Sequence, residues 1–265
     1  MIEITGNTRL YGIVADPIAQ VKTPQTMHKV FERRGTDGVL VPMHVPPAGL
    51  SDLVQALRGV RNFGGMVVTV PHKASMVALC DVVTPEARSV GAVNIVRREA
   101  DGTLAGDILD GKGFVAGLLQ SGIHPKGLSV LMCGAGGAAK AIAFALAQAG
   151  IQKLAIYNRT QASAIQILQG IEHHYPQVKT MLGSEDPTGF ELVINATTLG
   201  MRPEDAFPLD VQRLQSTQTV AEIIMTPALT PLLKYAQDKG CRIQYGLPML
   251  ECQIEMMADF MGVEK

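Results

Sequence analysis

The sequence predicts an α/β fold built from two domains. Two observations support this prediction: stretches typical of strands and helices alternate along most of the chain, and charge and glycine gather at residues 97–113. Such alternation is typical of a mainly parallel sheet with crossover helices, and a local change in composition is typical of a domain junction. The chain, at 265 residues, is long enough for two domains of ordinary size.

Strand and helix signals alternate before the junction. Apolar, β-branched runs predict strands, and amphipathic stretches bounded by proline or glycine predict helices. In chain order we expect a strand at 9–15, a helix at 24–35, a strand at 38–45, a helix at 49–59 and a strand at 64–70. The last strand is expected to end in a turn that carries His72 and Lys73.

The alternation resumes from Leu128 and predicts a second α/β unit. Strands are expected at 128–134, 153–158, 191–197 and 219–224, with helices near 138–149 and 161–173. The C-terminal segment has apolar residues three or four positions apart, which predicts an amphipathic helix. They are Leu247, Leu250, Ile254, Met257 and Met261. We expect this methionine-rich face to pack in a core rather than to form a groove for a partner.

The composition argues against several classes of function. Lys and Arg number 23 against 24 for Asp and Glu, with no run of like charge, so a nucleic-acid or membrane-surface role has no electrostatic support. The longest apolar span, 130–150, is interrupted by glycines and by Lys140 and Gln148, which predicts a strand and a core helix rather than a membrane helix. The N-terminus lacks the features of a secretion signal, and a cytoplasmic protein is expected.

The cysteines and histidines show no metal-binding spacing. The cysteines, Cys80, Cys133, Cys241 and Cys252, lie far apart in apolar surroundings, and we expect buried, reduced thiols. His173 and His174 are neighbours that point to different sides of the predicted helix. No metal site is predicted.

A glycine-rich loop follows the first strand of the second unit. Gly134, Gly136 and Ala139 have G-x-G-x-x-A spacing between a buried strand and a helix. The first glycine permits a tight turn, the second lets the backbone approach a pyrophosphate, and the alanine allows close helix–strand contact. The helix N-terminus then faces the anion. In this context the loop predicts dinucleotide binding, the alternative being a tight turn without a ligand.

The end of the following strand distinguishes the dinucleotides. An NAD site usually has an Asp or Glu there, whereas this strand ends in Asn158, Arg159 and Thr160. The rigid fork of donors of an arginine suits a 2′-phosphate, so the sequence predicts NADP, with NAD as the alternative cofactor. The other interpretation of Arg159 is a solvated turn residue.

Lys73 is a candidate catalytic residue. When an alcohol becomes a ketone, hydride leaves carbon while the hydroxyl proton passes to a base, and a lysine can be that base. Asp110, which leads into the second unit, is the candidate carboxylate that would orient the lysine and share the proton. Spacing alone does not bring the two together, and the other interpretation of Lys73 is a surface residue.

Eight short motifs, taken in order, resemble those of the shikimate dehydrogenase family. They are VTVPHK (68–73), VGAVN (90–94), GDILDG (106–111), GAGGAA (134–139), NRT (158–160), NATTLGM (195–201), TPLL (230–233) and GLPMLECQ (246–253). The motifs span nearly the whole chain, and several are specific to that family.

The resemblance implies an N-terminal α/β substrate-binding domain and a Rossmann domain for NADP. The first would comprise residues 1–109 and a C-terminal helix that returns to it within 246–265, and the second would comprise 110–245. Members of the family reversibly oxidise the ring 3-hydroxyl of shikimate, or of relatives such as quinate, by hydride transfer to NADP or NAD. The active site would lie between the domains, and the protein would be a monomer or homodimer that binds a small cyclic polyol.

The resemblance also implies individual site residues. Lys73 and Asp110 match the catalytic lysine and aspartate. The substrate-binding positions are Val21, Thr23, Thr69, Asn94 and Gln253. The cofactor-binding positions are Gly134, Ala135, Gly136, Gly137, Ala138, Asn158, Arg159, Thr160, Thr197 and Gly246.

The sequence departs from the family where the family holds the substrate carboxylate. Two serines of a PIxHSxSP-like motif do so in typical members, helped by a later tyrosine. This chain has PIAQVKTP (17–24), so the serine positions are Val21 and Thr23, and we assign the tyrosine position to Ala221. Each hydrogen bond to a charged group contributes about 1.5–3 kcal/mol. Losing two such donors would therefore weaken shikimate binding about a hundredfold or more.

A milder departure concerns the cofactor. NADP users of the family often carry another basic residue shortly after NRT, where this chain has Ser163. Selectivity for NADP over NAD is therefore expected to be modest.

Three hypotheses for function follow. The favoured one is an NADP-dependent dehydrogenase that acts on a shikimate-like cyclic polyol and has an altered carboxylate site. The alternative is an orthodox shikimate 5-dehydrogenase of the shikimate pathway, which serves aromatic amino acid biosynthesis, in which Thr23 suffices for the carboxylate. The third is a non-catalytic dinucleotide-binding sensor.

Overall fold

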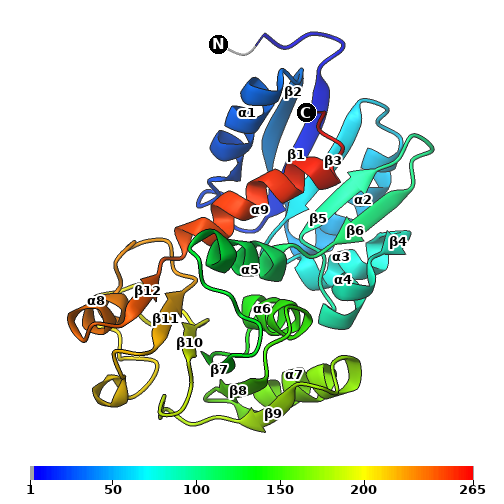
Figure 1. Ribbon diagram of the computed structural model, residues 1–265. Helices are drawn as coiled ribbons and strands as arrows, with labels where there is room; N and C mark the ends of the chain where they lie inside the picture. The colour runs from blue at the N-terminus through cyan, green and yellow to red at the C-terminus, as the bar shows by residue number, and fades with distance from the viewer. Residues whose placement is uncertain (1–2, 265) are drawn as a thin grey trace. The chain divides into compact units, whose positions relative to one another are not determined.

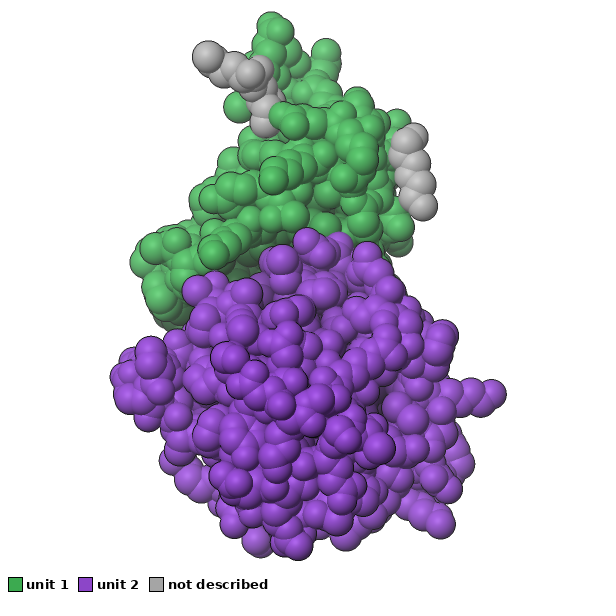
Figure 2. All heavy atoms as spheres, turned by 60° about the vertical axis from the view of Figure 1, so that its left-hand side comes forward, with its two compact units in different colours: residues 1–109, 253–265 green, residues 110–252 purple. Residues whose placement is uncertain are grey.

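The computed structural model describes residues 3–264, which fold into two compact units (Figures 1 and 2). The first unit runs to Leu109 and is completed by the residues from Gln253 onward, and the second runs from Asp110 to Cys252. This division differs from the expected boundary at 245/246, since it places residues 246–252 with the second unit. Gly246 packs there so closely that a Cβ on it would lie 2.4 Å from the backbone oxygen of Ile224.

The first unit is built on a six-stranded mixed sheet with the order β2-β1-β3-β5-β6-β4. Its strands are β1 (Arg9–Ala15), β2 (Gly38–His44), β3 (Phe63–Val68), β4 (Val82–Val83), β5 (Ile95–Arg98) and β6 (Leu104–Asp107). Its helices are α1 (Thr23–Arg34), α2 (Leu50–Arg58), α3 (Lys73–Leu79) and α4 (Pro85–Val90), with a 3-10 turn, η1 (Pro47–Gly49).

The expectation of a mainly parallel sheet holds for only part of this unit. Strands β1, β2 and β3 are parallel, but β5 runs antiparallel to both β3 and β6. The β5–β6 hairpin occupies much of the segment that we expected to be a domain junction. Its strands have only four residues each, too few for a clear periodic signal, and Arg97 and Arg98 in β5 mask the apolar pattern.

The core of the first unit explains the apolar pattern of its elements. Every residue of β3 is buried, as expected for a strand covered on both faces. Tyr11 of β1 and Phe31 of α1 belong to one core cluster together with Ile254, Met257 and Met261 of the C-terminal segment. Packing of this methionine-rich face in a core is thereby confirmed. Leu247, expected on the same face, is 46% exposed and lies outside it.

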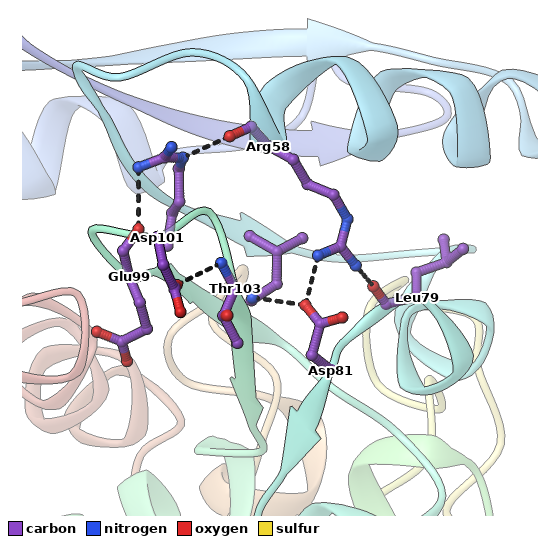
Figure 3. Close-up of polar contacts among 8 residues, drawn as sticks. Arg58, Leu79, Asp81, Glu99, Asp101 and Thr103 are labelled. Carbon is purple, nitrogen blue, oxygen red and sulfur yellow. Dashed lines mark hydrogen bonds and ion pairs between the residues drawn. The ribbon is translucent and has the colours of Figure 1, made fainter.

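A polar network ties the short strands to α2 (Figure 3). Arg58, the last residue of α2, donates to the carboxylate of Asp81 and, over 2.9 Å, to the backbone oxygen of Leu79. The same carboxylate accepts the Leu104 N–H at 2.8 Å, and the Arg58 hydrogen bond holds the pKa of Asp81 below its usual value. The two-residue strand β4, which follows Asp81, is thus anchored by side chains as well as by its own pairing.

The second unit contains six parallel strands in the order β12-β11-β10-β7-β8-β9. They are β7 (Ser129–Cys133), β8 (Lys153–Tyr157), β9 (Lys179–Leu182), β10 (Leu192–Asn195), β11 (Thr219–Glu222) and β12 (Arg242–Gln244). The helices are α5 (Asp110–Gln120), α6 (Gly137–Gln148), α7 (Gln161–His174), α8 (Pro231–Asp238) and α9 (Leu247–Phe260), with a 3-10 turn, η2 (Val211–Arg213). α9 ends among the residues of the first unit.

Numbered within the unit, this strand order is 3-2-1-4-5-6, which is the order of a Rossmann fold. The predicted α/β class, with a Rossmann unit, is confirmed. Such folds bind ligands beyond the carboxyl ends of the strands, where the order reverses. In this unit the reversal lies between β7 and β10, and β7 leads into the glycine loop.

All four cysteines are unpaired thiols, but only Cys133 and Cys241 are buried, whereas Cys80 and Cys252 are half-buried. The prediction of four buried thiols is therefore wrong for two of them. Burial raises the pKa of Cys133 to about 12 and that of Cys80 to about 11. Between residues 3 and 264, no helix combines the length and the apolar character needed to cross a bilayer.

Candidate functional site

The first group of predicted site residues lies at one edge of the first sheet. Strands β1, β2 and β3 are parallel, so their carboxyl ends share an edge. Thr69 directly follows β3, and its N–H donates to the backbone oxygen of Val14 in β1 (3.1 Å). His72, which is only 1% exposed, donates its Nε2–H to the backbone oxygen of Val45 beyond β2 (2.8 Å). The segment before Lys73 is therefore held both to β1 and to the residue that follows β2.

Lys73 is the first residue of α3, not part of a turn as we expected. Its backbone oxygen accepts the Val93 N–H at 2.9 Å, and its side chain is half-buried. A cation at a helix N-terminus is opposed by the helix dipole. The helix dipole therefore does not explain a lysine at this position, and the catalytic role of Lys73 stays a prediction.

Asn94 lies beside the end of β3. It is 1% exposed, and its backbone oxygen accepts the Val68 N–H at 2.8 Å. Its side-chain Oδ1 accepts the Leu109 N–H at 2.9 Å. Because β5 is antiparallel to β3, the residue that precedes β5 lies at the same edge as Thr69 and Lys73. The structure thus brings these three predicted residues together.

Asp107, at the end of β6, was missed by the sequence analysis. It is 4% exposed, and its Oδ1 accepts hydrogen bonds from Thr84 Oγ1 (2.5 Å) and from the Ile108 N–H (2.7 Å). Its backbone oxygen accepts the Asn94 N–H at 2.9 Å. The available signal was an acid within GDILDG, directly ahead of the predicted catalytic aspartate. Asp107 shapes the chain that leads from the first sheet to Asp110.

Asp110 is the first residue of α5 and is 7% exposed. A carboxylate at this end of a helix is stabilised by the helix dipole, so its place has a structural explanation as well as a functional one. Asp110 begins the second unit, whereas Lys73 belongs to the first. The predicted pairing of these two side chains stays a prediction.

The predicted carboxylate-binding positions lie where β1 leads into α1. Val21 is half-buried and packs against the core cluster of the first unit. Thr23 is the half-buried first residue of α1. Gln253, in α9, is 5% exposed. Of these three side chains, that of Val21 offers no hydrogen-bond donor.

The assignment of the family tyrosine position to Ala221 is wrong. Ala221 lies inside β11, pairs with Ile194 and Gln244 on either side, and is fully buried. A side chain at this position points into the interior of the second unit. It cannot face a ligand.

The predicted cofactor residues follow the carboxyl ends of four parallel strands of the second unit. Gly134 follows β7, Asn158 follows β8, Thr197 lies just after β10, and Gly246 lies just after β12. Since all these strands are parallel, the residues lie at one edge of the sheet. This edge is where a Rossmann fold binds its ligand.

The glycine loop has the geometry that a pyrophosphate requires. Gly134 has φ of 111°, a left-handed conformation that favours glycine, and a Cβ on it would lie 2.7 Å from the Ala196 oxygen. Around Gly136 and Gly137 there is open space within 4 Å of where a Cβ would be. α6 begins at Gly137, so the unpaired N–H groups of its first turn border this space. The loop therefore fits a dinucleotide phosphate.

The neighbouring segments border the same edge. Asn158 Nδ2 donates to the backbone oxygen of Thr160 (2.9 Å), which shapes the turn that carries the exposed side chain of Arg159. Thr197 donates both its N–H (3.0 Å) and its Oγ1–H (2.7 Å) to Oδ1 of Asn195. Ala135 and Ala138 lie half-buried in the glycine loop and at the start of α6. No cluster of three His, Cys, Asp or Glu side chains suited to a metal ion occurs within residues 3–264.

Glu222 is a second residue that the sequence analysis missed. It ends β11, is fully buried, and accepts hydrogen bonds on Oε1 from Asn195 Nδ2 (3.0 Å) and Thr230 Oγ1 (2.9 Å). Burial raises its pKa to about 7. The available signal was an acid at the end of an otherwise apolar strand, TVAE.

The sheet order, the glycine loop and the edge that surrounds it define the class of the protein: a two-unit α/β protein with a dinucleotide-binding Rossmann unit. The family described as shikimate dehydrogenase substrate binding domain matches residues 13–96. The chain is 37% identical over 275 residues to the shikimate dehydrogenase (NADP(+)) of Geobacter metallireducens, covering 99% of this chain and 94% of that one. The chain belongs to the shikimate dehydrogenase family, as predicted.

Solved structures agree with this membership. The shikimate 5-dehydrogenase from Listeria monocytogenes, in complex with shikimate and NAD, matches with a TM-score of 0.92 at 32% identity, over 100% of this chain and 95% of that one. The ligand-free 5-ketofructose reductase of Gluconobacter sp. strain CHM43 matches with a TM-score of 0.90 at 32% identity, over 98% of this chain and 95% of that one.

Proposed function

We propose that the protein is an NADP-dependent oxidoreductase that reversibly oxidises a ring hydroxyl of a shikimate-like cyclic polyol in which no carboxylate needs to be held. Oxidation of a CH–OH group and use of NADP follow from its family, whose relative in Geobacter metallireducens carries both in its name. That the substrate lacks a carboxylate is the part of the proposal that goes beyond family membership. The observation that supports it is the position of Val21.

Val21 supports a substrate without a carboxylate because of where it packs. Its side chain offers no donor, and it lies half-buried against the apolar core cluster of the first unit. An apolar surface beside a carboxylate withholds both hydrogen bonds and water, which is costly for a charge. The hydroxyl groups of a polyol need less compensation than a carboxylate. The similarity to a 5-ketofructose reductase, whose named substrate is an uncharged sugar, agrees with this view.

The chemistry is assigned to the residues of both units. Bound NADP would supply the acceptor for the hydride that leaves the carbinol carbon. As the C–H bond gives up its electron pair and the C–O bond becomes a carbonyl, Lys73 accepts the hydroxyl proton, and Asp110 orients the amine and shares that proton. In reduction the same proton returns to the oxygen.

The remaining polar residues hold the substrate. Thr69, Asn94 and Gln253 are assigned to the ring hydroxyls. Since Oδ1 of Asn94 already accepts the Leu109 N–H, the amide is oriented, and Nδ2 is the end that would donate to a hydroxyl. A donor that is oriented before binding loses little conformational freedom on binding.

Arg159 is assigned to the 2′-phosphate of NADP. It is exposed in the turn after β8, at the same sheet edge as the glycine loop. The Listeria monocytogenes relative was solved with NAD, so both dinucleotides occur among the similar proteins. With a single arginine at this turn, we expect only a modest preference for NADP over NAD.

The orthodox activity is the second candidate function. The 37% identity to a shikimate dehydrogenase (NADP(+)) and the hydroxyl of Thr23 favour it. In that case Thr23 would hold the shikimate carboxylate without help from position 21.

Steady-state kinetics with NADP decide between the two. We expect a KM for shikimate in the many-millimolar range and a lower KM for cyclic polyols or sugars without a carboxylate. The variant Val21→Ser should lower the KM for shikimate about tenfold or more by restoring one donor to a charged group, whereas Val21→Ala, the matched control, should not. A micromolar KM for shikimate in the unchanged protein would establish the orthodox activity instead.

A further inference from the structure

Asp16 and His44 form a polar pair that the proposed mechanism does not use. Nε2 of His44 lies 2.8 Å from Oδ1 of Asp16, and the side chains are 58% and 34% exposed, respectively. An ion pair as exposed as this one contributes little to stability. Within residues 3–264, Nδ1 of His44 and Oδ2 of Asp16 make no hydrogen bond. The pair therefore offers two polar atoms that a ligand could bind.

The pair lies where the strand order of the first sheet reverses. From β1 the chain passes to β2 on one side and then to β3 on the other. Open α/β sheets bind ligands beyond the carboxyl ends of their strands at such a point. Here it lies between β1, which Asp16 follows, and β3, which Thr69 follows. The Asp16 N–H donates to the backbone oxygen of Val70 at 3.1 Å, so the two strand ends are joined beside the pair.

The register places His44 and Thr69 at the same level of this sheet. His44 pairs with Ala15 of β1. Val14, one residue earlier in β1, pairs with Val68 of β3. Thr69 is therefore level with Ala15 on the other side. Since neighbouring strands lie about 4.8 Å apart, the Cα atoms of His44 and Thr69 are separated by about 10 Å.

The other predicted residues of the first unit continue this line away from His44. Asn94 precedes β5, which pairs with β3 on the side opposite to β1. Lys73 begins the helix that follows β3. Along the edge, the polar pair is thus at one end and Asn94 at the other. A substrate that reacts at Lys73 and lies along this edge would direct its far end toward Asp16 and His44.

The chemistry of the pair suits hydroxyl groups. An ionised carboxylate only accepts hydrogen bonds, so Nε2–H of His44 donates to Asp16, and Oδ2 of Asp16 stays available as an acceptor. Nδ1 of His44 accepts when the ring is neutral and donates when it is charged, and a hydroxyl group can bind it in either state. The pair as a whole carries a negative charge or none. It therefore gives no net attraction to a carboxylate, whereas two neighbouring hydroxyls could both be bound.

An exposed apolar side chain borders the pair. Val70 is 64% exposed, although the strand that it follows, β3, is buried throughout. Its backbone oxygen is the acceptor of the Asp16 N–H. The C–H groups of a sugar-like ring are apolar, and contact with Val70 would remove them from water. A few polar groups beside an apolar surface are typical of sites for small molecules.

We propose that Asp16 and His44 form a subsite for two neighbouring hydroxyl groups of the substrate, at the end remote from the carbinol carbon that reacts. This inference rests on the proposed function and narrows its substrate class to uncharged polyols with adjacent hydroxyls at that end. The two residues determine specificity and take no part in the proton transfer.

The test measures the binding of two uncharged ring polyols by calorimetry. NADPH is bound beforehand, because an alcohol cannot be oxidised by the reduced cofactor and binding is then observed without turnover. One probe, myo-inositol, has neighbouring hydroxyls, whereas 1,3,5-cyclohexanetriol has none. We expect the Kd of the unchanged protein to be about tenfold lower for myo-inositol, as for an added hydrogen bond to a charged group.

Two variants remove the proposed subsite. Asp16→Ala and His44→Ala should each raise the Kd for myo-inositol about tenfold and leave the Kd for the triol unchanged. His124→Ala removes an exposed histidine of the second unit and is the matched control. It should bind both polyols as the unchanged protein does. Thermal unfolding checks that all three variants are folded.

The proposal is overturned if the unchanged protein does not bind myo-inositol more tightly than the triol, or if neither variant removes that preference. It is also overturned if His44→Ala raises the KM for shikimate and leaves the Kd for myo-inositol unchanged, because the pair would then serve a carboxylate. A micromolar KM for shikimate in the unchanged protein contradicts the proposed function. A Kd for myo-inositol that neither substitution changes removes this inference alone.

Discussion

The side chain of Asn94 accepts the backbone N–H of Leu109 through Oδ1 at 2.9 Å. Asn94 is a predicted substrate ligand, and Leu109 directly precedes the predicted catalytic Asp110. One buried amide thus orients the predicted substrate donor and shapes the chain that enters α5. If Asn94 binds the substrate as predicted, this hydrogen bond links substrate binding to the stability of the first unit.

We expect Asn94→Ala to affect both properties. The Leu109 N–H would lose its acceptor in a buried place, which costs about 1–3 kcal/mol, and the substrate would lose a donor. The free energy of unfolding from urea titration and the KM from steady-state kinetics check these effects. The control is Asn62→Ala, which removes a longer, less buried hydrogen bond to the Thr8 oxygen (3.2 Å). If both variants were destabilised equally, the Asn94 hydrogen bond would contribute no more to the free energy of unfolding than the Asn62 hydrogen bond does.

Lys73→Met should reduce turnover and leave the cofactor in place. Methionine keeps much of the aliphatic volume but cannot accept a proton, so we expect kcat to fall about 10²–10⁴-fold with little change in the Kd for NADPH. Fluorescence titration measures the second quantity. Lys29→Met, on the exposed side of α1, is the matched control. Full turnover in Lys73→Met would contradict the assigned role. Absence of turnover in the unchanged protein with every polyol tried would favour a sensor.

Arg159→Ala should reduce the preference for NADP. An arginine that donates to a phosphate is worth about 1.5–3 kcal/mol, so the ratio of kcat/KM with NADP to that with NAD should fall about tenfold or more. Activity with NAD should change little, because NAD has no 2′-phosphate. Equal losses with both cofactors would show that Arg159 acts on the fold of the turn instead.

The raised pKa of Glu222 predicts how stability depends on pH. The pKa is about 7 in the folded protein against a usual value of 4.5, so the folded state holds its proton more tightly. The stabilisation is therefore complete below pH 4.5 and is lost as the pH rises to about 7, by up to about 3 kcal/mol. Thermal or urea unfolding of the unchanged protein and of Glu222→Gln measures this. The difference between their free energies of unfolding should change across this window and stay constant above it.

Local pattern explains which elements could be predicted. Strand β1 begins and ends at the residues that the sequence indicated, and α7 differs by one residue at its end. Continuous apolar runs and periodic helices carry strong short-range signals. The β5–β6 hairpin was missed because its strands have only four residues each and include Arg97 and Arg98, so they carry almost no short-range signal. The start of α9 within the second unit depends on the packing of Gly246 against Ile223 and Ile224, which is a long-range contact.

The candidate site, too, contains residues that the sequence could identify and residues that it could not. The glycine loop, Arg159, Lys73 and Asp110 are identifiable because their chemistry is carried by residue type at a local position. Glu222 was not, because its significance arises from an amide 27 positions away along the chain and a hydroxyl 8 positions away. The error at Ala221 has the same origin: the sequence does not say which side of β11 that residue faces.

The sequence by itself determined the α/β class, the dinucleotide loop and the family. It also identified the predicted acid–base groups of a hydride-transfer reaction. All of these depend on residue type and short spacing. Only the tertiary structure decided the strand order, the antiparallel half of the first sheet and the environment of each buried acid. Hydrogen-bond partners and burial are set by chain segments that meet across the fold. The charge that Glu222 carries near neutral pH is therefore a property of its neighbours and not of its place in the sequence.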